Sequence, residues 1–152
     1  LAHPERYSYF WDIIEDIIDL IKMGTVMQIN AGSLLGYNGT QASFASEMML
    51  AEGLAHVIAS DAHRANRAIG FNLPRAAETF QEKYPHIDFE KLISENPWKI
   101  LQGEVMEIDD DPCYRFDKNK QFKKWKRFYF VHDILGFGNT TKKKRKKVRR
   151  YI

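Results

Sequence analysis

The sequence predicts an α/β fold in which short buried strands alternate with amphipathic helices. Residues 9–23 carry apolar side chains at helical spacing, with acidic residues on the opposite face. Two short apolar segments, 25–30 and 55–60, each follow a predicted helix. This alternation is typical of a parallel sheet or a β/α barrel. The 152 residues, 44% of them hydrophobic, suit one ordinary domain with a core.

Capping and turn residues set the element boundaries in chain order. Ser8 caps the first helix and Gly24 ends it, and the strand 25–30 follows. After two loop segments, 31–33 and 36–39, the second helix ends at a glycine before the strand 55–60. Asn96, as an N-cap, and Pro97 predict the start of a last helix. The helices expected between the first and the last are 41–52, 72–84 and 89–94.

The charge distribution divides the chain near Gly103. Residues 1–103 contain 8 Lys/Arg and 13 Asp/Glu, a net charge of −5, whereas residues 104–152 contain 15 and 7, a net charge of +8. We therefore predict one domain over 1–103, followed by an acidic linker and a basic, aromatic-rich tail that is partly disordered. Such a tail suits nucleic acid, an anionic membrane surface or an acidic protein partner.

The expected location is cytoplasmic. The sequence has no apolar run of 18 residues and no visible signal peptide at Leu1. Its one cysteine, Cys113, excludes an intrachain disulfide, which agrees with a reducing compartment. We expect no functional role for Cys113.

Metal-type ligands follow the ends of two predicted strands. His3 lies at the start of the chain, and Asp61 and His63 directly follow the strand 55–60. Active sites of β/α barrels lie at the carboxyl ends of the strands. Imidazole and carboxylate ligands suit zinc, manganese or iron, and such a metal lowers the pKa of bound water to roughly 7. The sequence therefore predicts part of a metal site.

Arginines accompany both ligand segments. Arg6 follows His3 by three residues, and Arg64 and Arg67 follow His63. Because a guanidinium can hold phosphate oxygens through two hydrogen bonds, this grouping favours a phosphate ester as the substrate.

The remaining polar residues receive structural or neutral interpretations. We expect Glu5 to be an ion-pair partner of a nearby arginine rather than a ligand. His56, His86 and His132 have no ligand-like neighbours and are predicted to have no function.

Four segments in order resemble a known family. They are Ala-His-Pro-Glu-Arg-Tyr (2–7), Gln-Ile-Asn-Ala-Gly-Ser-Leu-Leu-Gly (28–36), Ala-Ser-Asp-Ala-His (59–63) and Glu-Asn-Pro-Trp-Lys-Ile-Leu (95–101). The set resembles the C-terminal part of the bacterial tyrosine-protein phosphatases of the PHP (polymerase and histidinol phosphatase) superfamily. These are the manganese-dependent enzymes of capsular and exopolysaccharide operons.

The resemblance implies a distorted seven-stranded β/α barrel with a three-metal cluster. It implies that His3, Asp61 and His63 are metal ligands, that Arg6 binds the substrate phosphate, and that Arg67 is the second phosphate-binding arginine, with Arg64 as the alternative. The implied cofactor is manganese, with zinc and iron as alternatives. The implied substrate is a phosphotyrosine protein, a bacterial tyrosine kinase that controls polysaccharide synthesis.

The resemblance also implies an incomplete site. The family's N-terminal His-x-His pair, a further His and the metal-bridging glutamates would all precede Leu1. We therefore expect a fragment that is inactive alone and lacks the N-terminal half of the barrel, whereas the complete protein is active. Two alternatives stay open: a PHP phosphatase of small monoesters such as histidinol phosphate, and a non-catalytic protein that binds nucleic acid or membrane through its basic tail.

Overall fold

A short parallel sheet lies at the centre of the fold. In the computed structural model, which describes residues 1–63, 72–109 and 111–134, β1 (Gln28–Asn30) pairs in parallel with β2 (Val57–Ala59). Ala2 makes an isolated parallel bridge to Gln28 on the other side of β1. The carboxyl ends of three strand segments therefore lie side by side at one edge, as expected for an α/β fold.

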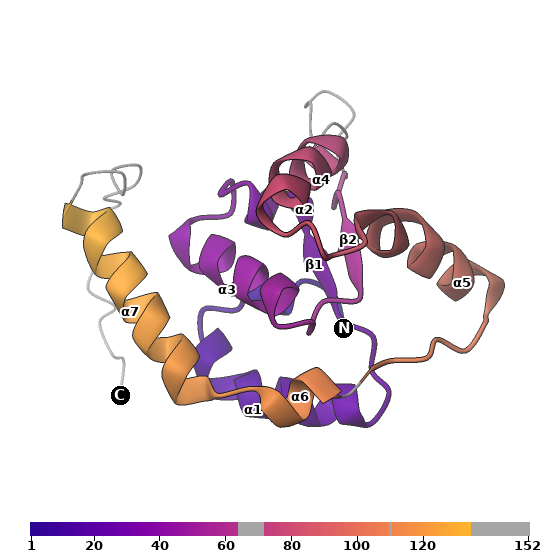
Figure 1. Ribbon diagram of the computed structural model, residues 1–152, viewed down its shortest axis with the longest axis horizontal. Coiled ribbons are helices and arrows are strands. Elements are labelled where there is room, and N and C mark those ends of the chain that lie inside the picture. Colours follow the sequence, from indigo (N-terminus) through magenta and orange to yellow (C-terminus); the bar gives the residue numbers. More distant parts are fainter. Residues whose placement is uncertain (64–71, 110, 135–152) are drawn as a thin grey trace, which may run out of the picture.

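Helical connections link each strand segment to the next. α1 (Phe10–Lys22) leads to β1, and α2 (Ala31–Leu34) with α3 (Thr40–Ala51) leads from β1 to β2. Figure 1 shows the two strands between α3 and α5, with α1 running below them. The helices bury their apolar faces against the strands, and the largest fully buried side chains of this core include Phe10, Ile14, Ile17, Ile21, Met27, Ile29, Met49, Leu54 and Ile58.

The predicted α/β order is confirmed, but the first loop is not a loop. Residues 31–34 form the short helix α2, and all four are buried. The backbone of Asn30 is still extended (φ −94°, ψ 134°), so the helix begins immediately where β1 ends. A turn of helix at this point satisfies backbone groups that a buried loop would leave without partners.

α5 (Asn96–Gln102) begins at the predicted residue, but the predicted N-cap role of Asn96 is wrong. A π-helical turn, η3 (Lys91–Glu95), runs without interruption into α5 (Asn96–Gln102), and the backbone of Asn96 is itself helical. Because Pro97 has no N–H, a wider turn just before it loses no hydrogen bond and relieves the clash of its ring. The Asn96 side chain is buried instead, and its Nδ2 donates to the His56 carbonyl oxygen at 2.8 Å.

The chain beyond residue 103 partly packs on the core. After the linker come α6 (Asp111–Arg115) and α7 (Lys118–Ile134), and α4 (Asn72–Lys83) precedes them in the chain. On α7, the rings of Phe122 and Trp125 lie 5.7 and 5.9 Å from that of Trp11. Lys118 also pairs with Glu15 at 3.1 Å. The boundary at residue 103 stays a prediction, and the basic run 142–150 lies outside the described residues.

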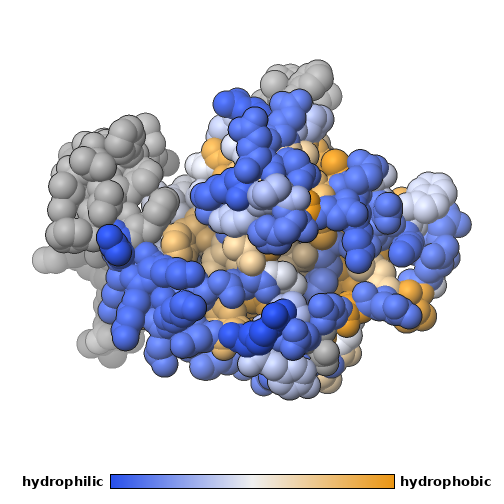
Figure 2. Space-filling model, in the orientation of Figure 1, coloured by the Kyte–Doolittle hydropathy of each residue, from blue (hydrophilic) through white to orange (hydrophobic). Residues whose placement is uncertain are grey.

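The surface is mainly polar on the face drawn in Figure 2, and apolar residues reach it toward the right of that view. No helix among the described residues is long and apolar enough to cross a membrane. The large apolar side chains exposed on α5 and just after it are Trp98, Ile100, Leu101 and Val105.

We expect His56 to make stability depend on pH. Its side chain is 8% exposed, Nδ1 accepts the Met27 N–H at 2.9 Å, and burial lowers its pKa from 6.5 to about 4. Below pH 6.5 the unfolded chain binds a proton at His56, whereas the folded chain does not bind it until about pH 4. The free energy of unfolding therefore falls by about 3 kcal/mol as the pH drops from about 6.5 to 4. Urea denaturation of wild type and His56→Asn at pH 7, 6, 5 and 4 measures this; an equal pH slope in both proteins contradicts it.

We expect Phe122 to stabilise the whole chain. It stacks on Trp125 with ring centroids 5.3 Å apart and is partly buried against the core. Phe122→Ala should lower the free energy of unfolding by about 2 kcal/mol. This is less than the loss expected for a fully buried Phe, because Phe122 is only partly buried. Lys123→Ala, exposed on the same helix, is the control. If the two variants unfold at the same urea concentration, α7 does not contribute to the core.

Candidate metal and phosphate site

Both ligand-bearing segments begin with a residue in left-handed backbone conformation. His3 has φ 40° and Asp61 has φ 53°, and no other non-glycine residue with positive φ occurs within the described ranges. Such conformations are uncommon for residues with a Cβ and concentrate at functional sites. Each turns the chain sharply where a strand segment ends, at the shared carboxyl edge of the sheet.

An ion pair joins the two segments directly. Arg6 Nη1 donates to Asp61 Oδ2 at 2.9 Å, across 55 residues of sequence. The two side chains are 41% and 34% exposed, so the pair lies at the surface of the site. Asn30 Nδ2 donates to the same Oδ2, also at 2.9 Å. The sequence prediction that Arg6 and Asp61 belong to one region is therefore consistent with their contact in the structure.

Glu5 does not form the ion pair with a nearby arginine that we expected from the sequence. It is fully buried, and its Oε1 accepts the Asn30 N–H at 3.1 Å and the Ser33 hydroxyl at 2.8 Å. Among the described residues no cation pairs with it, because Arg6 turns toward Asp61 instead. Burial raises the pKa of the Glu5 carboxyl, while its hydrogen bonds act in the opposite direction. Glu5 thus holds the η1 turn (Pro4–Arg6) against the end of β1.

His63 is held in a defined tautomer. Its Nδ1 lies 2.7 Å from the Asp61 carbonyl oxygen. A carbonyl can only accept, so Nδ1 carries a proton, and in the neutral ring Nε2 keeps its lone pair. Metal-binding histidines in proteins are typically oriented by a hydrogen bond of this kind on the other ring nitrogen. The His63 side chain is 67% exposed, so Nε2 is accessible.

The three predicted ligands fit a metal in chemistry but not in number. Among the described residues, His3 Nδ1 is buried without a hydrogen-bond partner and Asp61 Oδ1 accepts no hydrogen bond, and the neutral His63 ring has a lone pair on Nε2. Imidazole and carboxylate donors suit manganese, zinc or iron. Within the described part of the chain, however, no group of three His, Cys, Asp or Glu side chains gathers closely enough to hold one ion. The residues therefore fit a metal only as part of a larger ligand set.

The other residues singled out from the sequence are either outside the described part of the chain or distant from this set. Arg64 and Arg67 fall outside the described residues, as does the side chain of His132. His56 is buried against β1, and the ring of His86 lies 6.2 Å from that of Tyr84.

Asn30 and Ser33 are functional candidates that the sequence analysis missed. Asn30 is 1% exposed at the carboxyl end of the central strand. The rule that led to His3 and Asp61, a polar residue where a buried strand ends, applies equally to Asn30. Ser33 had no comparable signal, since its role depends on the helix that replaces the predicted loop.

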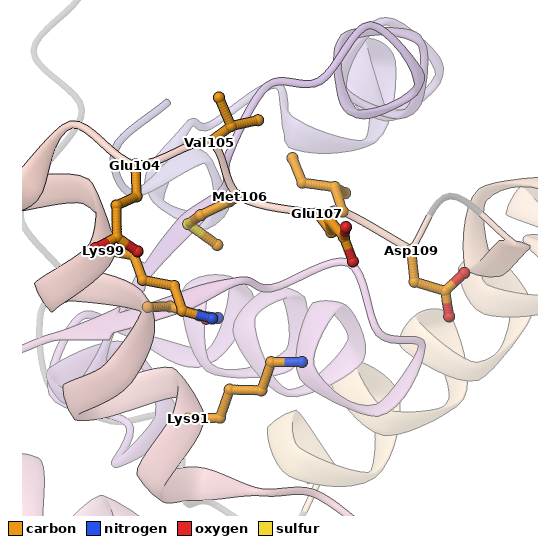
Figure 3. Close-up of a pocket in the computed structure, with 9 residues that line it drawn as sticks. Lys91, Lys99, Glu104, Val105, Met106, Glu107 and Asp109 are labelled. Carbon is orange, nitrogen blue, oxygen red and sulfur yellow. The ribbon is translucent and has the colours of Figure 1, made fainter.

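A separate hollow lies between α5 and the linker after it. Figure 3 shows Lys91 and Lys99 on one wall, with Glu107 and Asp109 on the facing linker. The cavity measures about 610 Å³, and none of the predicted site residues lines it. It is therefore distinct from the strand ends that carry His3 and Asp61.

Two named relatives share part of this chain. A 63-residue stretch is 43% identical to CapC of Staphylococcus aureus, provisionally named a tyrosine-protein phosphatase, and covers 41% of this chain and 25% of CapC. A 106-residue stretch is 26% identical to the tyrosine-protein phosphatase YwqE of Bacillus subtilis (strain 168), covering 70% of this chain and 41% of YwqE.

A solved structure shares the fold. It comes from a crystallographic study of YwqE from Bacillus subtilis and CpsB from Streptococcus pneumoniae, described there as unique metal-dependent tyrosine phosphatases. It superposes with a TM-score of 0.61 at 26% identity, over 72% of this chain and 43% of that one. The chain thus spans less than half the length of the relatives that it matches.

The family pattern described as capsular polysaccharide synthesis, CpsB/CapC, matches residues 1–102. That range contains the sheet, its connecting helices, the strand-end site and α5. The chain therefore belongs to the CpsB/CapC family of capsular polysaccharide synthesis.

Proposed function

We propose that this chain supplies part of the active site of a manganese-dependent protein-tyrosine phosphatase. The proposed substrate is a phosphorylated bacterial tyrosine kinase that regulates capsular or exopolysaccharide synthesis. The names of the relatives support the reaction class, and the family description supports the link to capsule synthesis. The single cysteine favours a cytoplasmic location, which belongs to the same proposal.

The contact between Arg6 and Asp61 carries the proposal. It brings a predicted phosphate-binding cation and a predicted metal ligand together, from the ends of two strand segments, at 2.9 Å. One N–H of the guanidinium is used by Asp61, and several of its five donors remain for an anion. A carboxylate that fixes the guanidinium on one side pre-organises it to receive a phosphate on the other.

The side chains divide the chemical tasks. When bound, the metal supplies a Lewis acid that activates water and neutralises phosphate charge. Asp61 Oδ1, His63 Nε2 and His3 Nδ1 are the atoms that this chain offers to hold it. Arg6, helped by Arg67 in our proposal, binds and orients the phosphate oxygens so that water attacks phosphorus opposite the tyrosine oxygen.

The proposed activity requires more polypeptide than this chain. Three ligands are too few for the cluster that the resemblance implies, and the paired strands are a small part of the proposed seven-stranded barrel. We propose that the residues of the longer relatives that this chain does not span provide the remaining strands and ligands. Residues 1–152 alone are expected to be inactive.

A chimera tests this proposal. The part of YwqE that precedes its match to this chain is fused to residues 1–152, and release of inorganic phosphate from a phosphotyrosine peptide is measured with manganese. We expect activity from the chimera, none from residues 1–152, and a loss of at least about 100-fold in Asp61→Ala and His63→Ala chimeras. Manganese-dependent activity of residues 1–152 alone contradicts the expected inactivity. A chimera that hydrolyses histidinol phosphate but no phosphotyrosine contradicts the proposed substrate class.

Arg6 is expected to act on the phosphate rather than on folding. In the same chimera, Arg6→Lys keeps the charge but loses the planar, two-pronged geometry, so kcat/KM for the phosphopeptide should fall by about 10- to 100-fold. Arg75→Lys, at an exposed arginine bonded to Tyr37, is the matched control. Equal kcat/KM in the two variants, with unchanged unfolding midpoints, removes Arg6 from the phosphate site.

A further inference from the structure

Asn30 contacts both ligand-bearing segments at once. Its backbone N–H donates at 3.1 Å to Oε1 of Glu5, which lies two residues after His3 in the first segment. Its side-chain Nδ2 donates at 2.9 Å to Asp61 Oδ2 in the second segment. It lies at the carboxyl end of β1, the middle one of the three aligned strand segments. This position allows one residue to reach both neighbours.

The orientation of the Asn30 amide is fixed by what it faces. A carboxylate can only accept, so the group directed at Asp61 is the NH₂. Asn30 Oδ1 is then left buried without a partner among the described residues. A polar group with an unsatisfied atom is unfavourable inside a protein, so this arrangement is poorly explained as a device for stability alone.

The two donors on Asp61 determine which of its oxygens is available. Arg6 and Asn30 both donate to Oδ2, each at 2.9 Å, whereas no hydrogen bond from the described residues reaches Oδ1. Oδ1 is the oxygen on the side of His63, whose Nδ1 lies 4.0 Å from it. His63 in turn donates from Nδ1 to the Asp61 carbonyl oxygen, so Nε2 is the ring nitrogen that can bind a cation. One oxygen and one nitrogen of this pair are thus left for a cation.

We propose that Asn30 is a positioning residue that holds Asp61 so that Oδ1 faces the metal. The proposal rests on the metal site proposed above. Arg6 alone cannot serve this purpose in the phosphatase, because the same guanidinium is proposed to bind phosphate and its exposed contact can change on substrate binding. Asn30 is only 1% exposed, so water does not compete for its hydrogen bond to Asp61 as it does for the exposed contact of Arg6. Hydrogen-bond partners of metal ligands commonly change metal affinity 10- to 100-fold when removed.

A manganese titration of the full chain tests this role. Wild-type, Asn30→Ala or Asn96→Ala protein is added to a Mn²⁺ solution. The electron paramagnetic resonance signal of the ion that remains free is followed in each titration. Asn96 is the matched control: it is 5% exposed and its Nδ2 donates one buried hydrogen bond, to the His56 carbonyl. We expect affinity to fall about 10- to 100-fold in Asn30→Ala and to stay within about twofold in Asn96→Ala. Equal affinities of folded wild type and Asn30→Ala overturn the proposal.

A measurement on the metal-free chain separates this proposal from the proposed function. If wild type binds no Mn²⁺, the chain offers no metal site by itself, and hydrogen exchange of the Asn30 side-chain amide decides whether Asn30 holds Asp61. We expect slow exchange by NMR in wild type, and loss of that protection in Asp61→Ala, relative to the exposed Asn119. Fast exchange in wild type, or unchanged protection in Asp61→Ala, overturns the positioning role.

Discussion

The parallel alignment of three strand segments is the constraint on which the site depends. Ala2, β1 and β2 point in one direction and are held in register, with Gln28 opposite both Ala2 and Val57. Because their carboxyl ends coincide, the residues that follow them meet although they are far apart in sequence. Arg6, Asn30 and Asp61 are brought into one hydrogen-bonded group in this way. Without that alignment, the two ligand segments would be unrelated surface loops.

A buried polar group reinforces the alignment at the expense of stability. Glu5 is fully removed from water, and within the described ranges only one of its oxygens has hydrogen-bond partners, the Asn30 N–H and the Ser33 hydroxyl. A carboxyl in such surroundings has a raised pKa, because burial disfavours its charged form. The local backbone is also strained, since His3 and Asp61 adopt left-handed conformations. Features that disfavour folding thus concentrate where the sheet ends, in contrast to the apolar core below.

The sequence was sufficient for the element order, because apolar periodicity acts locally. Capping was a poorer guide: Tyr9 rather than the predicted Ser8 precedes α1, and no side chain of the described residues caps the start of that helix. Helical spacing located α1, and buried runs located β1 and β2, although each strand is shorter than predicted. It was insufficient where tertiary contacts decide. The partner of Glu5 depends on which way Arg6 turns, and Asn96 is drawn from a capping role to the His56 carbonyl of a neighbouring strand. Asn30 could have been found by the strand-end rule, whereas Ser33 could not.

The central claim is that Asp61 and His63 present a prepared pair of donor atoms to a metal. Anomalous scattering at the manganese absorption edge, from crystals of the YwqE chimera grown with Mn²⁺, tests it most directly. The account predicts an anomalous peak within coordination distance of Asp61 Oδ1 and His63 Nε2, with Asn30 still bonded to Asp61 Oδ2. A peak confined to the acidic linker near Glu107 and Asp109, or none at Asp61, would contradict it.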